Sequence, residues 1–320
     1  MSFSEKELKQ HCEIILKQRK IRNKIIVLCE GVIPKEQGRL SPQSYGRMDE
    51  LPDSNFYKAC IPSDWRNSRP EFFNCGDCNN VVNTYFTLLA MIDEDIDNQY
   101  FHPKRIFAIV DLDIQIRPIY NYRFSNTQEI FCNLYDKLKI NQANTHNDQP
   151  HEILVTGLIH KEAYFLVPAL QSIFDGYSIQ PFYKDSELLL EDIYLAMSQD
   201  LCLDADLKAN FAIACSRINH CTGLDFGGID KLKDSWISEF QNTTDENRIH
   251  ELIFSLLTTR KAKEYWLQVQ PNDEWSRDVS VYRDQLSLEI AREFYAKQTD
   301  DEAAAKYHIP YFFKMLRKFA

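Results

Sequence analysis

Two short apolar runs, KIIVLCEG at residues 24–31 and RIFAIVDLD at residues 105–113, decide how this chain is expected to fold. Each run is rich in β-branched residues and ends in acidic residues, which is typical of a buried strand that closes in a polar turn. A carboxylate at the end of a buried strand is an odd choice for packing alone. The two runs together therefore predict a sheet and a functional site at its edge.

Further strands and helices alternate with these two runs along the chain. Apolar runs predict strands at 69–75 and 151–160, and apolar residues at helical spacing predict helices at 3–20, 54–60, 79–96, 126–140 and 161–174. Strands that alternate with helices at this spacing favour βαβ units and a mostly parallel sheet. The expected fold class is therefore α/β.

The pattern divides the chain into three expected parts. An N-terminal helix occupies residues 1–20, and an α/β domain follows over residues 21–184. Within that domain, residues 32–54 are rich in proline and glycine, so we expect an inserted irregular loop there. Residues 185–320 show helical periodicity and few strand signals, which predicts a mainly helical C-terminal region.

The composition is that of a soluble globular protein, with 44% hydrophobic and 26% charged residues. No apolar run approaches the ~18–20 residues that a membrane helix needs, and the first residues are charged rather than signal-like. The nine cysteines are scattered and odd in number, which fits reduced thiols. These features predict a cytoplasmic protein without a membrane partner.

A formal net charge of −10 argues against a broadly basic surface for nucleic acid. A local basic track is nevertheless present, and it could provide weak nucleic-acid contacts. Its members are Lys17, Arg19, Lys20, Arg22 and Lys24. The simpler interpretation of such a segment is a solvated helix face.

The acidic residues after the two apolar runs are the strongest functional signal. Ligands of parallel sheets bind beyond the carboxyl ends of the strands, where Glu30 and the pair Asp111 and Asp113 are expected. Residues two apart on a strand project from one face, so the two aspartates can converge. Clustered carboxylates repel one another unless a cation lies between them, and oxygen ligands suit Mg²⁺ or Mn²⁺. Such an ion can stabilise phosphoryl charge and activate water.

This order of motifs resembles the Toprim domain, which topoisomerases, primases, recombination proteins and the overcoming-lysogenization-defect nucleases share. The resemblance rests on a strand that ends in Glu-Gly and a later strand that ends in D-x-D. Three further stretches, PDSNFYKAC (52–60), NCGDCNNV (74–81) and LIHKEAYFL (158–166), resemble segments of stand-alone Toprim nucleases of bacterial anti-phage systems. The resemblance covers roughly residues 20–175.

The resemblance implies a Toprim-like fold and a Mg²⁺-dependent nuclease that cuts DNA or RNA as a defence effector, controlled by an ATPase partner. Carried over, Glu30 is the essential acid, as a metal ligand or general acid/base, and Asp111 and Asp113 bind the metal. Glu162 is an additional ligand. Asp53 takes the place of the acid that usually follows Glu-Gly directly, although here the inserted segment intervenes.

The two residues that precede Glu162, His160 and Lys161, each have two possible roles. His160 could contact phosphate from the rim of the site or could simply lie at a helix entry. Lys161 has the same two interpretations, and a cation near several carboxylates has an electrostatic reason to be there.

Other functions stay open at this stage. A Toprim-like fold without catalysis could serve as a binding or regulatory subunit that docks on a partner, and a primase- or topoisomerase-type role is a third reading. Cys75 and Cys78 form a C-x-x-C without the second pair that zinc needs. No P-loop sequence is present, so an ATPase activity would have to come from the partner. The aromatic stripe of the last helix predicts a buried face or a docking helix.

Overall fold

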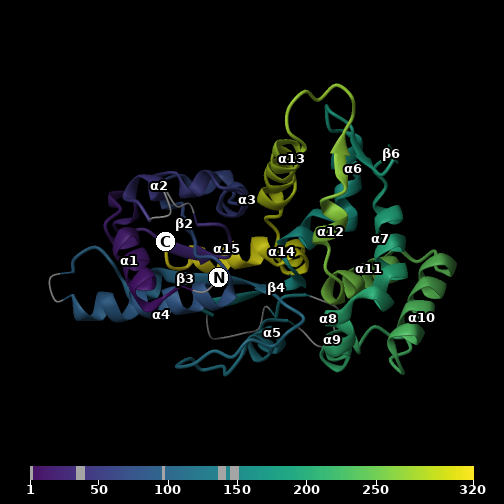
Figure 1. The fold of residues 1–320 in the computed structure, drawn as a ribbon, viewed down its shortest axis with the longest axis horizontal. Helices are drawn as coiled ribbons and strands as arrows, with labels where there is room; N and C mark the ends of the chain where they lie inside the picture. The colour runs from purple at the N-terminus through teal and green to yellow at the C-terminus, as the bar shows by residue number, and fades with distance from the viewer. Residues whose placement is uncertain (1–2, 34–39, 96–97, 136–141, 145–150) are drawn as a thin grey trace.

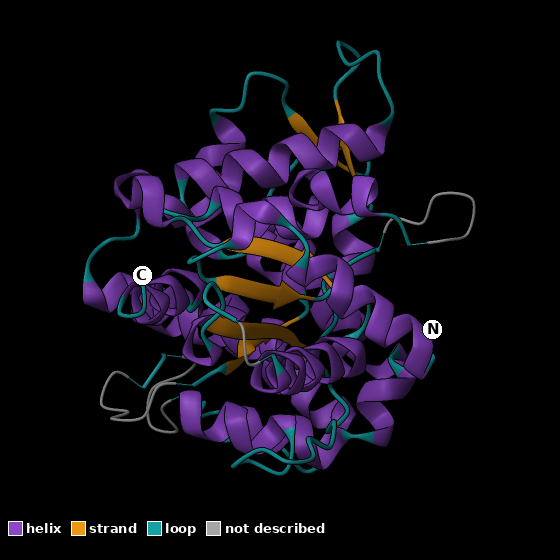
Figure 2. Cartoon of the chain, turned by 90° about the vertical axis from the view of Figure 1, so that its left-hand side faces the viewer, coloured by secondary structure: helices purple, strands orange, loops and turns teal. Residues whose placement is uncertain are grey.

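A parallel four-stranded sheet forms the centre of the computed structural model, which describes residues 3–33, 40–95, 98–135, 142–144 and 151–320. The strand order is β2-β1-β3-β4, and neighbouring strands run parallel. The strands are β1 (Ile26–Cys29), β2 (Glu71–Asn74), β3 (Ile106–Leu112) and β4 (Ile153–Ile159). Helices enclose the sheet (Figure 2), as its nearly continuous apolar strands require. The predicted α/β class with a helical C-terminal region is confirmed.

The helices of the first half begin at capping residues that are visible in the sequence. Ser4 forms a capping box at the start of α1 (Glu5–Leu16), Asp77 caps α4 (Cys78–Glu94), and Asn126 caps α5 (Thr127–Leu134). Each cap accepts a backbone N–H that the first helical turn leaves unpaired. Helix α4 packs on β3, and α1 packs on α4, so these two helices cover one face of the sheet.

The inserted segment is more regular than expected. It contains α2 (Pro42–Gly46), a 3₁₀ turn (Met48–Glu50) and the first residues of α3 (Pro52–Ala59), while residues 34–39 lie outside the described part of the chain. The expectation of an irregular loop over residues 32–54 is therefore wrong for its second half. Pro42 and Pro52 each occupy the first helical position, where proline starts a helix rather than breaking one.

The helix predicted at 161–174 is also wrong, because the segment is divided. It forms a 3₁₀ helix (Lys161–Phe165), a second 3₁₀ turn (Pro168–Leu170) and the short α6 (Gln171–Asp175). Pro168 has no N–H to donate and its ring clashes with the preceding turn, so a continuous helix cannot pass through it.

The C-terminal region is helical, with one small sheet that the sequence pattern did not predict. Strands β5 (Pro181–Tyr183), β6 (Ser186–Glu187) and β7 (Val269–Pro271) pair antiparallel in the order β6-β5-β7. The boundary expected at residue 184 falls inside the β5–β6 hairpin. The helices are α7 (Leu190–Gln199), α8 (Ala205–Ala209), α9 (Phe211–Ile218), α10 (Ile229–Asn242), α11 (Glu246–Thr259), α12 (Lys263–Trp266), α13 (Val279–Glu293), α14 (Asp301–Tyr307) and α15 (Ile309–Arg317).

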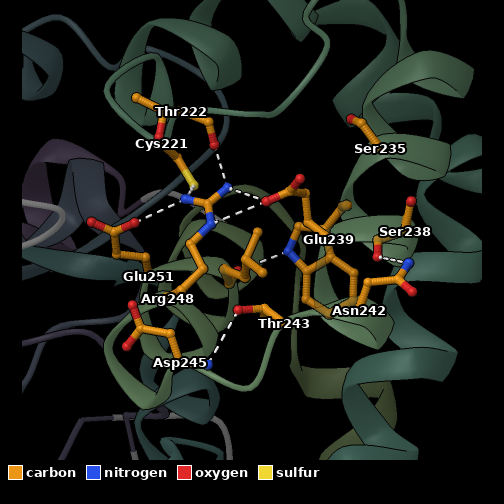
Figure 3. Close-up of polar contacts among 12 residues, drawn as sticks. Cys221, Thr222, Ser235, Ser238, Glu239, Asn242, Thr243, Asp245, Arg248 and Glu251 are labelled. Carbon is orange, nitrogen blue, oxygen red and sulfur yellow. Dashed lines mark hydrogen bonds and ion pairs between the residues drawn. The ribbon is translucent and has the colours of Figure 1, made fainter.

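A single guanidinium joins α10, α11 and the turn that precedes α10. Arg248 donates to Glu239 at 3.1 Å, to Glu251 at 2.8 Å and to the carbonyl oxygen of Thr222, as Figure 3 shows. Hydrogen bonds between ionised partners are the strongest of the ordinary kinds. This network fixes the first turn of α11 against α10, which lies on the side of α11 away from the four-stranded sheet (Figure 1).

The chain ends by returning to the sheet. Phe313 of α15 lies edge-on to Phe72 of β2, and Phe319 packs on Phe107 of β3 with ring centroids 5.3 Å apart. Phe312 and Leu316 are fully buried. The aromatic stripe of the last helix is therefore a buried face of this chain, and the alternative of a docking helix is wrong. None of the described helices is long and apolar enough to cross a membrane.

Candidate functional site

A pocket of about 170 Å³ lies at the carboxyl ends of β1 and β3. The structure brings Glu30, Asp111 and Asp113 together there, as their positions after neighbouring strands led us to expect. The described residues that line the pocket are Glu30, Asp77, Cys78, Asn79, Asp111, Asp113, Arg117 and His160. Four of these eight side chains are carboxylates, and two are basic.

Glu30 joins the ends of the two central strands. Its Oε1 accepts the backbone N–H of Asp111 at 2.8 Å, so the carboxyl group is held over β3. Burial raises the pKa of Glu30 well above its ordinary value, and the negative charges of Asp111, Asp77 and Asp113 raise it further. Glu30 therefore holds a proton more readily than an exposed glutamate does.

Asp113 has the opposite character, although it lines the same pocket. Its Oδ2 accepts a hydrogen bond from Arg117 at 2.8 Å. Burial acts to raise the pKa of Asp113, but the bond from Arg117 and the nearby His160 outweigh it and the pKa is lowered. Arg217 of α9, a buried residue, donates to the carbonyl oxygen of Asp113 at 2.8 Å and so attaches the helical region to the site.

Asp111 receives its partners from the turn after β4. Its Oδ2 accepts the backbone N–H of Lys161 at 3.3 Å, and Nδ1 of His160 lies 3.8 Å away. His160 has a φ of 60°, a left-handed conformation that turns the chain sharply at the strand end. Burial acts to lower the pKa of His160, but Asp111 outweighs it and the pKa is raised. His160 therefore binds a proton more readily than a free imidazole does.

Asp53 reaches the end of β1 in spite of the insertion. Gly31 has a φ of 149°, and a Cβ at this position would lie 2.5 Å from Oδ2 of Asp53 and 2.7 Å from the Asn74 amide. Only glycine permits this approach. Asp53 forms an ion pair with Nζ of Lys161, which raises the pKa of the buried lysine against the effect of burial. The structure thus places both residues beside the pocket.

Two groups of candidate residues lie elsewhere. Glu162 is not among the described lining residues and instead faces Lys263 of α12 at 4.0 Å. The basic track lies at the amino ends of the strands, the edge opposite the pocket, because Lys20 and Lys24 both pair with Glu71 at the start of β2. Arg22 stacks on Tyr100 at 4.3 Å.

The other members of the track are more exposed. Lys17 pairs with Glu13 at 3.6 Å on the surface of α1, and Arg19 is exposed to solvent. Together with the Glu71 pairs, these contacts match the simpler interpretation of the track as a solvated face.

Sequence reasoning missed three residues at the site. Asp77 was visible as an acid in the glycine-containing turn, and its role as the α4 cap explains its position at the pocket wall. Arg117 lies four positions after Asp113, the spacing at which ion pairs form on a helix, but this segment is not helical. No local signal could have identified Arg217, because it reaches Asp113 from a distant part of the chain.

The donor set suits a hard divalent cation in kind, since carboxylate oxygens are the ligands that Mg²⁺ prefers. The raised pKa of Glu30 also indicates a surplus of negative charge at this point. In the arrangement seen here Asp113 is engaged by Arg117 and Glu30 by a backbone N–H. Within the described ranges, no three His, Cys, Asp or Glu side chains are placed to hold a metal ion as they stand.

The C-x-x-C cysteines take different positions. Cys75 is buried, with Nε2 of His11 3.4 Å from its sulfur, while Cys78 lies at the pocket wall. Burial raises the pKa of both thiols, so neither has the low pKa of a reactive cysteine.

Comparison of the chain with protein-family models, curated proteins and solved structures gives no significant match.

Proposed function

We propose that this protein is a divalent-metal-dependent nuclease that hydrolyses phosphodiester bonds of DNA or RNA. The observation that carries the proposal is the grouping of Glu30, Asp77, Asp111 and Asp113 around one pocket at the carboxyl ends of adjacent strands. Three of these acids are partly buried, and grouping four carboxylates around one small pocket costs stability unless the site has a use for them. Phosphoryl transfer depends mostly on positioning and charge stabilisation, which acids with a bound cation provide.

The residues would divide the work according to their charge states. Asp111, Asp113 and Glu30 would hold Mg²⁺ or Mn²⁺, which when bound would stabilise phosphoryl charge and activate water. Asp113 has a lowered pKa and so stays ionised, which suits a ligand. Glu30 would ligate the ion only in its ionised form; because its pKa is raised, it would in its protonated form instead act as a general acid at the leaving oxygen, with the ion held by the two aspartates. His160 and Lys161 supply positive charge at the rim for a phosphate oxygen.

The decisive experiment compares Glu30→Gln with wild type on plasmid DNA and structured RNA, with Mg²⁺, Mn²⁺ or EDTA. Glutamine keeps an oxygen for the Asp111 N–H but cannot ligate or donate as a carboxyl group does. We expect cleavage by wild type with metal and a loss of at least ~100-fold in the variant. The surface variant Glu13→Gln should cut like wild type. Metal-independent cleavage, or full activity of Glu30→Gln, would contradict the proposal.

A second candidate function is supported by one observation. Because no three described donors converge and Arg117 already neutralises Asp113, the pocket could belong to a non-catalytic binding or regulatory subunit. Calorimetric titration with Mn²⁺ separates the two. A nuclease binds the ion and loses that binding on Asp113→Asn, whereas a non-catalytic subunit gives no heat of binding even at millimolar Mn²⁺. Control by an ATPase partner in antiviral defence rests on the sequence resemblance alone.

A further inference from the structure

A second pocket, of about 540 Å³, is lined by four cations in a chain whose net charge is −10. Lys58 and Arg69 come from the first half of the chain, and Arg292 and Lys297 come from the helical region. No carboxylate is among its described lining residues, which otherwise include the polar Asn55 and Ser63. We infer that this basic pocket binds the phosphodiester backbone of a nucleic acid strand.

The two arginine charges of the basic pocket are available to a ligand. No ion pair between a carboxylate and Arg69 or Arg292 exists in the part of the chain that the structure describes. Lys297 pairs with Glu293 one turn earlier, and both side chains are largely exposed. An exposed pair of this kind contributes little and can exchange its partner. The guanidinium groups of Arg69 and Arg292 thus line the pocket with no carboxylate paired to them among the residues that the structure describes.

Two packed helices connect the basic pocket with the acidic one. In helix α3, Asp53 lies beside Gly31 and Lys58 lies at the basic pocket, about 8 Å farther along the helix axis. Helix α13 packs against α3. Its Asp284 lies near Asp53 and Lys161, whose charges affect the pKa of Asp284, and its Arg292 lies about 12 Å farther on.

A strand that runs from the basic pocket to the acidic one would pass along these helices. A stacked strand advances about 3.4 Å per nucleotide, so the 8–12 Å along the helices alone corresponds to roughly two to four nucleotides, with the remaining distance to the carboxylates in addition. Arginine and lysine bind backbone phosphates, and Asn and Ser add hydrogen bonds to phosphate or sugar oxygens. A strand held at the basic pocket would present a nearby phosphodiester to the carboxylates.

The inference rests on the proposed function, since it names where the substrate lies, but binding is tested without catalysis. Fluorescence anisotropy with a 5′-fluorescein 20-nucleotide single-stranded DNA, the matching RNA and the DNA duplex is measured in EDTA at several salt concentrations. We compare wild type, Arg69→Gln/Arg292→Gln and the control Lys6→Gln/Lys9→Gln. The control removes two exposed lysines of α1 and changes the net charge equally.

We expect the pocket variant to bind at least ~10-fold more weakly and its salt slope to fall by about 1.4–1.8, as the loss of two phosphate contacts requires. The control should stay within twofold of wild type, and thermal denaturation should show that all three proteins are folded. Equal losses in both variants, unchanged binding in the pocket variant, or no binding by wild type to any probe would overturn the inference. Competition by free mononucleotide as strong as by oligonucleotide would also overturn it.

The two proposals fail in different ways. If the protein binds the probes through Arg69 and Arg292 but never cleaves them with metal, the nuclease proposal falls and the basic pocket stands. If it cleaves with metal while the pocket variant binds and cuts like wild type, the nuclease proposal stands and the basic pocket falls.

Discussion

Single residues in the acidic pocket differ in the direction in which their surroundings move the pKa. The pKa of Glu30 is raised and the pKa of Asp113 is lowered, although both residues line the same small cavity. The difference comes largely from Arg117, which donates a hydrogen bond to the Asp113 carboxylate. Pairs of acids whose pKa values are pushed apart are the pattern that divides acid and base roles in known sites.

A residue-scale prediction concerns pH, at a position far from these acids. His11 is fully buried against Tyr45 and Cys75, and burial lowers its pKa from 6.5 to about 3. Between these values the unfolded chain binds a proton that the folded chain does not, so stability falls as pH falls. The loss between pH 7 and pH 5 is about 2 kcal/mol for this one group.

Urea denaturation at pH 7, 6 and 5 measures this effect. His11→Gln should have a smaller decrease of unfolding free energy across this range than wild type, whatever its stability at pH 7. The exposed His102→Gln should keep the wild-type decrease. A decrease in His11→Gln as large as in wild type would show that His11 is not the titrating group.

At the scale of elements, the sequence predicted helices and strands best where the apolar pattern is regular and the ends of the element are marked by suitable residues. Helix α4 and strand β3 are examples, because Asp77 caps a periodic run and the β3 run is continuously apolar. The prediction failed where proline has two meanings. Pro42 and Pro52 start helices inside the presumed loop, whereas Pro168 interrupts a presumed helix. Which meaning holds depends on tertiary contacts that local sequence does not contain.

An element-scale prediction concerns the link between α9 and β3. Arg217 is 3% exposed and donates to the carbonyl of Asp113 at 2.8 Å and to Gln128 at 2.9 Å. Arg217→Met fills similar space but leaves these acceptors unpaired, so we expect a loss of about 2 kcal/mol in unfolding free energy. A double-mutant cycle with Gln128→Ala should give a coupling energy of at least ~0.5 kcal/mol. Strictly additive losses would mean that the guanidinium does not tie α9 to α5.

The candidate site was predictable to the same extent as the elements that carry it. Glu30, Asp111 and Asp113 follow strands that the pattern located, so their meeting at one edge could be expected. Arg217 could not be expected, because it depends on how the helical region folds back. The small sheet of β5, β6 and β7 escaped for a related reason, since two- and three-residue strands carry no period to detect.

On the scale of the whole molecule, the region after residue 184 completes the core of the parallel sheet. Helix α11 packs against β4, Phe313 of α15 packs on β2, and Phe319 just after α15 packs on β3. His308, fully buried at the start of α15, accepts or donates at Nδ1 with the Tyr164 hydroxyl 2.9 Å away. That hydroxyl also accepts the backbone N–H of Gly157 in β4. The last helices and the sheet should therefore unfold together rather than as independent units.

Gly157 offers the sharpest test of that coupling. A Cβ at this position would lie well inside van der Waals contact of the His308 imidazole, which is fully buried and held by a φ of 59°. Gly157→Ala should therefore lower the unfolding free energy by about 3 kcal/mol, the upper range for overpacking. Gly46→Ala, where a Cβ meets nothing within 4 Å, should change it by less than ~1 kcal/mol. If circular dichroism and tryptophan fluorescence of Gly157→Ala gave two separate urea transitions, the C-terminal helices would be an independent unit; coincident transitions at a lower midpoint are expected.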